Sequence, residues 1–152
     1  MPYSLDPTDE QNSIVEALRK EFPALTVIPD GMPDASDDEI ETFPDGSVKP
    51  FLVLWFAEPR RTSGRSFADY RLDAHEASVD VVGVARDATT CRLIMNQVSD
   101  FLIGFKTSGG GRLHKGESLW GDSRRYLDDS NKPARWVRTS RFQFGIASRK
   151  IL

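Results

Sequence analysis

A single stretch, residues 76–105, constrains the fold more than any other part of the chain. Its first part, residues 76–86, has apolar residues on both faces, as in a strand that is buried on both sides of a sheet. Asp87 follows and predicts a helix N-cap. Apolar residues then recur at three- and four-residue spacings and share one helix face: Cys91, Ile94, Met95, Val98, Phe101, Leu102 and Phe105. A strand that leads directly into so wide an apolar face predicts a helix over residues 88–105 that packs back on the sheet.

Shorter patterns on both sides of this stretch predict the remaining elements. A capping carboxylate and a proline, Asp6-Pro7, precede apolar residues that recur every four positions, which predicts a helix over residues 7–22. Three further segments have strand patterns: 25–28, 51–57 and 136–147. Segment 51–57 is apolar on both parities, which predicts a central strand or a strand whose outer face lies at a subunit contact.

Together these elements predict an α+β fold. Two main helices, about 7–22 and 88–105, would pack against a mixed, largely antiparallel sheet of about four to five strands, with long loops between the elements. A chain of 152 residues can bury a sizeable core without a second domain, so we expect a single domain over residues 1–152. The side chains expected to face this core from the two helices are Ile14, Leu18, Ile94, Val98, Phe101 and Leu102.

Long polar segments join the predicted elements. Residues 29–49 carry an acidic cluster and are typical of an exposed loop, residues 58–75 form a basic linker, and residues 106–111 are expected to be a flexible hinge. Residues 113–131 are polar and irregular. Because long loops on compact domains often carry function, they supply the candidate interface residues. These are Arg60, Arg61, Arg65, Trp120, Arg124 and Tyr126.

Composition excludes several classes of protein. No apolar run approaches the roughly 20 residues that a membrane span requires, so no membrane contact is expected. The N-terminus has neither a basic start nor an apolar core, which predicts synthesis in the cytoplasm without a signal peptide. A single cysteine, Cys91, excludes an intrachain disulfide and is expected to be a small buried hydrophobe. The net charge of −3 is too mild to indicate nucleic-acid binding by bulk charge.

The glycine-rich segment after the second helix invites comparison with a phosphate-binding loop. Gly111, Gly116 and Ser118 have the required spacing. The position of the essential lysine, however, is Glu117, whose carboxylate would repel phosphate. The segment also follows a helix, where the motif needs a strand. We therefore expect no nucleotide cofactor.

Other candidate catalytic groups are isolated in the sequence. His75 and His114 lie in predicted loops without a serine or cysteine at motif spacing, so we expect them to be exposed and unreactive. Asp80 interrupts the central strand. It is either an acid–base group or a carboxylate that pairs with Arg138 or Arg141 across the sheet, and the pairing role is favoured. The acidic loop lacks the glycine and terminal glutamate of a calcium loop. The sequence thus predicts no enzyme, no metal site and no cofactor.

The order of these elements resembles that of a known family. The opening helix over residues 12–22, the block 77–105 and the segment 132–147 carry the resemblance, which is to the tail-terminator proteins (tail-completion or minor tail proteins) of long-tailed bacteriophages. The resemblance implies a mixed sheet with helices against it and a hexameric ring. Such a ring caps the finished tail tube, stops addition of tube subunits and offers a surface for joining the head.

The same resemblance implies the partners and the location. The partners would be further copies of the chain, the tail tube protein and a head-completion or neck protein, at the head-proximal end of the virion tail. DNA would pass through the lumen without specific binding, which suits a mildly acidic subunit. We expect Arg60, Arg61 and Arg65 to meet acidic groups of a neighbouring subunit or of the tube. A neck or head–tail connector protein is the alternative, and a small enzyme is the remaining one.

Overall fold

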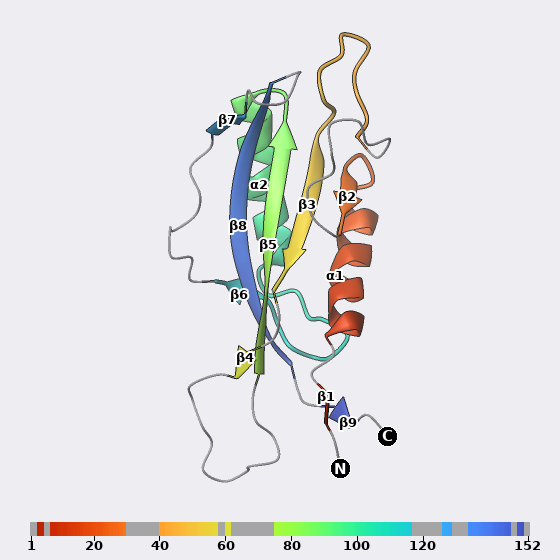
Figure 1. The fold of residues 1–152 in the computed structure, drawn as a ribbon, viewed down its shortest axis with the longest axis vertical. Coiled ribbons are helices and arrows are strands. Elements are labelled where there is room, and N and C mark those ends of the chain that lie inside the picture. The colour runs from red at the N-terminus through yellow and green to blue at the C-terminus, as the bar shows by residue number, and fades with distance from the viewer. Residues whose placement is uncertain are drawn as a thin grey trace.

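The computed structural model has the α+β architecture that the sequence predicts (Figure 1). It describes residues 3–4, 7–29, 40–57, 60–61, 75–116, 126–128, 134–146 and 149–150. The two helices are α1 (Thr8–Glu21) and α2 (Ala88–Leu102). The strands are β1 (Tyr3–Ser4), β2 (Thr26–Ile28), β3 (Phe51–Phe56), β4 (Arg60–Arg61), β5 (His75–Ala85), β6 (His114–Lys115), β7 (Tyr126–Asp128), β8 (Arg135–Ile146) and β9 (Arg149–Lys150).

The main sheet is mixed, as predicted. Its strand order is β2-β3-β5-β8-β6, with β4 added to β5 and β7 added to β8. Only β2 and β3 pair in parallel, whereas the other pairs in this sheet are antiparallel. The long strands β5 and β8 pair along 11 residues of β5, so they form the centre of the sheet. Strands β1 and β9 form a separate antiparallel pair.

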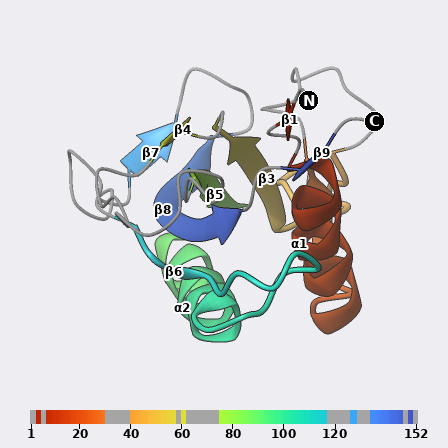
Figure 2. The ribbon, with the colours of Figure 1, turned by 90° about the horizontal axis from the view of Figure 1, so that it is seen from below.

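Both helices cover the same face of the sheet (Figure 2). The main core lies between them and the sheet, and it takes Ile14 and Leu18 from α1 and Met95, Val98 and Leu102 from α2. The predicted core positions are therefore confirmed, although Ile94 and Phe101 are only partly buried at its margin. There the ring of Phe101 packs edge-on against that of Phe22, with centroids 5.7 Å apart.

Gly83 allows α2 to approach β5 closely. A Cβ atom at this position would lie 2.7 Å from Cγ of Met95, which is itself buried, so a side chain here would push the helix away. The buried thiol of Cys91 also donates a 3.4 Å hydrogen bond to the Gly83 carbonyl oxygen. The expectation that Cys91 is a small buried residue is confirmed.

A second, smaller core occupies the other face of the sheet. Its buried residues are Ile28, Val48, Phe51, Val53, Val82, Val84 and Val137, with Ile40 packed against them. Residues on β3 and β5 are therefore buried on both sides, as the apolar runs on both parities predicted.

Part of the predicted acidic loop is a hairpin, which corrects the sequence interpretation of residues 29–49. Thr42 pairs with Val48, and Gly46 donates a 2.9 Å hydrogen bond to the Phe43 carbonyl oxygen with φ at +86°. A Pro-Asp-Gly turn favours this geometry because glycine tolerates positive φ. The hairpin places Val48 in the second core, while residues 30–39 lie outside the described part of the chain.

The end of α2 and the segment after it also differ from expectation. The helix ends at Leu102 instead of residue 105, and Gly104 follows with φ at +80°. Residues 106–112 form a tight hairpin, in which Thr107 donates a 2.8 Å hydrogen bond to the Gly111 carbonyl oxygen. Ser108 N–H reaches Ser13 Oγ of α1 at 3.2 Å. The predicted hinge is therefore a structured turn fastened to the first helix.

Helix α1 also begins later than predicted. Pro7 takes the N-cap position, where it makes no side-chain cap hydrogen bond, and the helix starts at Thr8. Proline was expected at the first helical position. The capping carboxylate predicted at Asp6 lies outside the described residues.

Candidate interaction site on the second sheet face

Three side chains form a row across the sheet on the face opposite the helices. The strand register pairs Trp55 of β3 with Asp80 of β5, and Asp80 with Arg141 of β8. Directly paired residues point to the same side of a sheet, and alternate residues of one strand point to opposite sides. Asp80 has the same parity as Val82, which belongs to the second core. The row therefore lies on the same face of the sheet as the second core, just beyond the residues that form it.

Asp80 and Arg141 form a two-point ion pair. Arg141 Nε lies 2.7 Å from Asp80 Oδ1, and Arg141 Nη2 lies 3.0 Å from Asp80 Oδ2. The hydrogen bond to Asp80 raises the pKa of Arg141 above its usual value. The side chains are 37% and 30% exposed, so solvent screens the pair and its contribution to stability is about 1 kcal/mol or less.

The predicted pairing of Asp80 across the sheet is thus confirmed, with Arg141 as the partner. Arg138 has the opposite parity to Arg141 on β8, so it points to the helix side and cannot serve. Both oxygens of the Asp80 carboxylate accept hydrogen bonds from the Arg141 guanidinium. This geometry makes Asp80 a structural partner instead of a poised base.

Trp55 stands beside this pair with half of its side chain exposed. It is 50% exposed, whereas Phe51, Leu52, Val53 and Leu54 before it on β3 are buried. The strand pattern predicted β3 as a central strand or one with an outer face at a contact. Its position between β2 and β5 makes it an interior strand of the sheet, yet Trp55 remains open to solvent. Sequence parity placed Trp55 on a face but could not indicate its exposure.

The predicted interface residues do not form one described patch. Arg60 and Arg61 lie on β4, which pairs with the start of β5, and Tyr126 lies on β7, which pairs with the first residues of β8. Along β8 these two places are eight residues apart, from Val137 to Gly145, which is about 26 Å. Figure 1 shows β4 and β7 at opposite ends of the sheet. The candidates outside the described residues are Arg65, Trp120 and Arg124.

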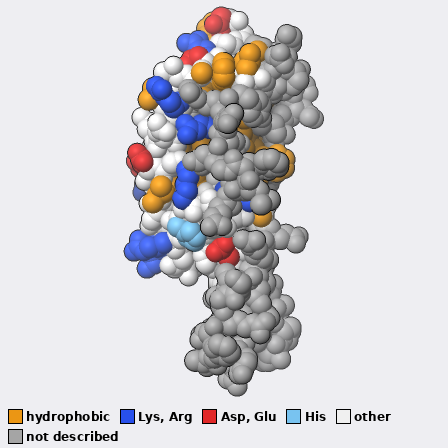
Figure 3. Space-filling view, turned by 90° about the vertical axis from the view of Figure 1, so that its left-hand side faces the viewer, with side chains coloured by type: hydrophobic (Ala, Val, Ile, Leu, Met, Phe, Trp, Pro, Cys, Tyr) orange, Lys and Arg blue, Asp and Glu red, His pale blue; other side chains and the backbone are white. Residues whose placement is uncertain are grey.

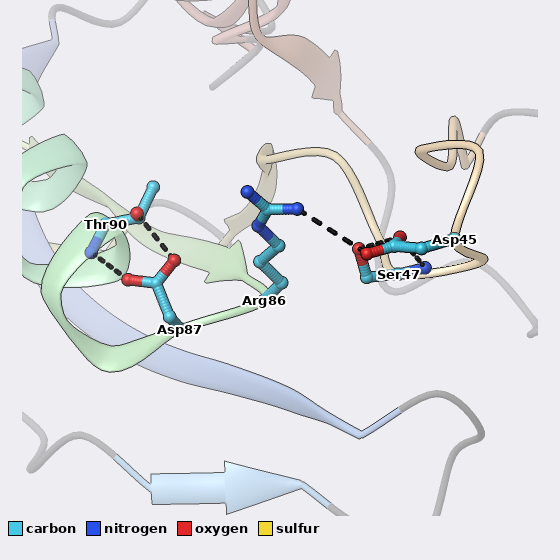
Figure 4. Close-up of polar contacts among 5 residues, drawn as sticks. All are labelled: Asp45, Ser47, Arg86, Asp87 and Thr90. Carbon is cyan, nitrogen blue, oxygen red and sulfur yellow. Dashed lines mark hydrogen bonds and ion pairs between the residues drawn. The ribbon is translucent and has the colours of Figure 1, made fainter.

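A polar cluster joins the 41–49 hairpin to the start of α2 (Figure 4). Asp87 caps the helix, since its carboxylate accepts hydrogen bonds from the backbone N–H of Thr90 at 2.7 Å and from its hydroxyl at 2.8 Å. The backbone bond is the main reason that the pKa of Asp87 lies below its usual value. Arg86 lies 3.8 Å from Asp45 and stacks over the Phe43 ring at 4.4 Å. These contacts hold the hairpin against the end of β5.

The remaining sequence candidates are scattered. Among the described residues, no three His, Cys, Asp or Glu side chains gather in a metal-binding arrangement. His114 is exposed, as predicted, but both histidines lie on strands instead of in loops, since His75 begins β5 and His114 begins β6. Gly111 lies in the hairpin after α2, while Glu117 and Ser118 fall outside the described residues. In that same part of the chain, neither helix has the length and apolar character of a membrane span.

Comparisons with known proteins assign no family. No family model matches the sequence, and no curated protein matches it either. Nine chains of solved structures match. One of them, whose name describes no function, aligns over 95% of this chain and 94% of its own with 15% identity and a TM-score of 0.42. A likeness of this strength carries no argument about function.

Proposed function

We propose that this protein is a structural virion protein: a tail terminator that forms a ring, caps the tail tube, stops its polymerisation and provides the surface for joining the head. The observation that carries the proposal is the row of Trp55, Asp80 and Arg141 on the second sheet face. We assign this row to contact with the end of the tail tube.

The row has the character of a protein-contact surface. Tryptophan is enriched at the centres of interfaces because it buries a large area and still offers one hydrogen-bond donor. Here Trp55 is 50% exposed, although the four residues before it on β3 are buried. The neighbouring Asp80 and Arg141 fix each other by two hydrogen bonds, so they present a preorganised polar edge to a partner.

The proposed partner, the tail tube, comes from the resemblance in the order of elements. Helix α1, strands β2, β3 and β5, helix α2 and strand β8 follow one another in the order on which the resemblance to tail terminators rests. Fold-level analogy suggests where such a surface is used, while the surface itself has to be tested residue by residue.

The direct test is addition of the purified protein to polymerising tail-tube subunits, with tube lengths measured by electron microscopy. We expect the wild-type chain to cap the tubes and shorten them. Trp55→Ala should bind tube ends at least about tenfold more weakly, as for a central interface residue. Leu93→Ala is the matched control, because Leu93 on α2 is also 50% exposed. Equal behaviour of the two variants would remove the row from the contact.

Phage assembly without this protein separates the two virion roles. Tubes of uncontrolled length that fail to join heads are expected for a terminator. Tails of normal length that lack only head attachment would instead identify a neck or connector protein.

A further inference from the structure

Arg135, the first residue of β8, is a buried cation. It is 5% exposed, and its Nε has no hydrogen-bond partner within the described part of the chain. A guanidinium carries only hydrogen-bond donors, and burial of such a group without a partner is unfavourable. By contrast, Figure 3 shows Lys and Arg side chains spread along the described surface of the β6 and β8 side, where water can solvate them. The burial of Arg135 therefore needs an explanation.

The strand register places a second arginine next to Arg135. Val137 of β8 pairs with Val84 of β5, and both belong to the second core. Arg135 precedes Val137 by two residues and Arg86 follows Val84 by two, so strand parity points all four side chains to the same face. The contacts of Arg86 with the 41–49 hairpin, which packs on this core, agree with that direction. The two arginines are therefore neighbours, directly beyond the Val84–Val137 pair.

Among the described residues, Arg86 is held by contacts that leave its hydrogen-bond donors unused. Its guanidinium carbon lies 4.4 Å from the centre of the Phe43 ring, and its Nη1 lies 3.8 Å from Oδ2 of Asp45 (Figure 4). The second distance is longer than a hydrogen bond. Asp45 Oδ1 instead accepts hydrogen bonds from the backbone N–H and the hydroxyl of Ser47, at 2.9 and 2.6 Å. Arg86 is thus fixed in position with N–H groups that a ligand can use.

Lys49 adds a third cation to this end of the second face. Its Nζ lies 5.9 Å from the centre of the Phe43 ring, the same ring on which Arg86 stacks. It also lies 3.8 Å from Oε2 of Glu41. Both side chains of this pair are exposed, so solvent weakens it. Positive charge is therefore gathered here with loosely held counter-charges.

We propose that Arg86 and Arg135 form a binding site for a small oxyanion, either a carboxylate or a phosphate group, and that Lys49 adds electrostatic attraction. The N–H groups of a guanidinium match the spacing of oxygens in both kinds of group, which makes arginine the preferred residue for binding them. The Nε of Arg135 then has the acceptor that the described residues do not provide. The inference goes beyond the tail-terminator function and does not depend on it.

An internal partner of Arg135 is the alternative. The register pairs Arg135 with Asp128 of β7. Removal of a buried cation that is bound to an internal carboxylate destabilises the fold, because the carboxylate is left unpaired. A buried cation that receives its partner only from a ligand lowers stability in the absence of that ligand. The two cases therefore predict opposite effects when an apolar side chain replaces Arg135.

Arg135→Met tests this difference, because methionine is long and flexible but carries no charge. In a buffer that contains chloride as its only salt anion, this variant should unfold at a higher urea concentration than the wild-type chain. Arg138→Met is the matched control, since Arg138 lies on the same strand but has the opposite parity, and its midpoint should stay close to that of wild type. An unchanged or lower midpoint for Arg135→Met would assign the cation to an internal partner and overturn the proposal.

Anion binding is measured on the arginine Nε–H signals by heteronuclear NMR. The signal of Arg135 is identified by its loss in Arg135→Lys. Acetate or inorganic phosphate, exchanged for chloride at constant ionic strength, should shift the Arg135 signal and slow its exchange with water. Tighter binding of acetate would assign a carboxylate source to the ligand, and tighter binding of phosphate a phosphoryl source. An Arg135 signal that neither anion shifts would overturn the proposal, because an internal carboxylate or a bound water would then be its partner.

Variants of the two arginines test whether they act together. Arg135→Lys, followed on the Arg86 signal, and Arg86→Gln, followed on the Arg135 signal, should each weaken anion binding at least about tenfold, since neither replacement restores the guanidinium geometry. Arg138→Lys should leave binding unchanged. Equal weakening by Arg138→Lys would show general electrostatic attraction instead of a site, and would also overturn the proposal. Circular dichroism verifies that each variant is folded.

Discussion

Replacement of Gly83 by alanine tests the close packing of α2 on β5. The added Cβ would lie 2.7 Å from Cγ of Met95, far inside van der Waals contact, and Met95 is buried with little room to move. Such overpacking costs about 1 to 3 kcal/mol. Removing a flexible glycine from a strand offsets about 0.5 to 1 kcal/mol of that. We therefore expect Gly83→Ala to lower the free energy of unfolding by about 1 to 2 kcal/mol.

The free-energy cost of the clash can be measured separately by truncating Met95. In a Met95→Ala background the clash disappears, so Gly83→Ala should become neutral or stabilising by about 0.5 kcal/mol, although Met95→Ala alone costs about 2 to 5 kcal/mol. Gly145→Ala on β8 is the matched control, because its Cβ would meet no atom within 4 Å. Urea unfolding followed by circular dichroism measures all four variants. Equal destabilisation by Gly83→Ala in both backgrounds would refute the packing argument.

Three further predictions concern single side chains. Phe101→Ala should cost about 3 kcal/mol, the lower end for a phenylalanine because this one is only partly buried, and a thermal melt like that of wild type would contradict its contact with Phe22. Asp80→Asn should cost about 1 kcal/mol or less in urea unfolding, and combination with Arg141→Gln should add nearly nothing. The folded-state pKa of Asp87 is depressed, so its contribution is present above the unfolded value of about 3.9 and is lost as the pH falls through the folded pKa. Asp87→Asn should flatten that acid slope in pH-dependent unfolding.

The sequence predicted the elements whose signals are local and periodic. The apolar positions of α2, the two-sided burial of β5 and the cap at Asp87 all follow from spacing along a single element. The Asp80–Arg141 pair could also be anticipated, because a lone carboxylate within an apolar strand needs a cation opposite it.

The features that were missed depend on single turn residues or on contacts between distant segments. The periodicity of α2 continues to Phe105, yet Gly104 turns the chain with a positive φ. The spacing of apolar residues does not indicate that turn. The 41–49 hairpin was signalled by Pro44-Asp45-Gly46, but the surrounding acidic residues obscured it. The exposure of Trp55 depends on which segments cover the second core and where that cover ends. The parity of residues along β3 does not predict this.

The central position of β8 sets the order in which the chain can fold during synthesis. Strand β6 pairs only with β8 in the described sheet, and β8 supplies Phe142, Phe144 and Ile146 to the main core. The Asp80–Arg141 pair joins residues separated by 61 positions, so the loop between them must close before the pair can form. Until β8 leaves the ribosome, β5 and α2 would expose an apolar surface, and a nascent chain stalled before residue 135 should be a strong chaperone substrate.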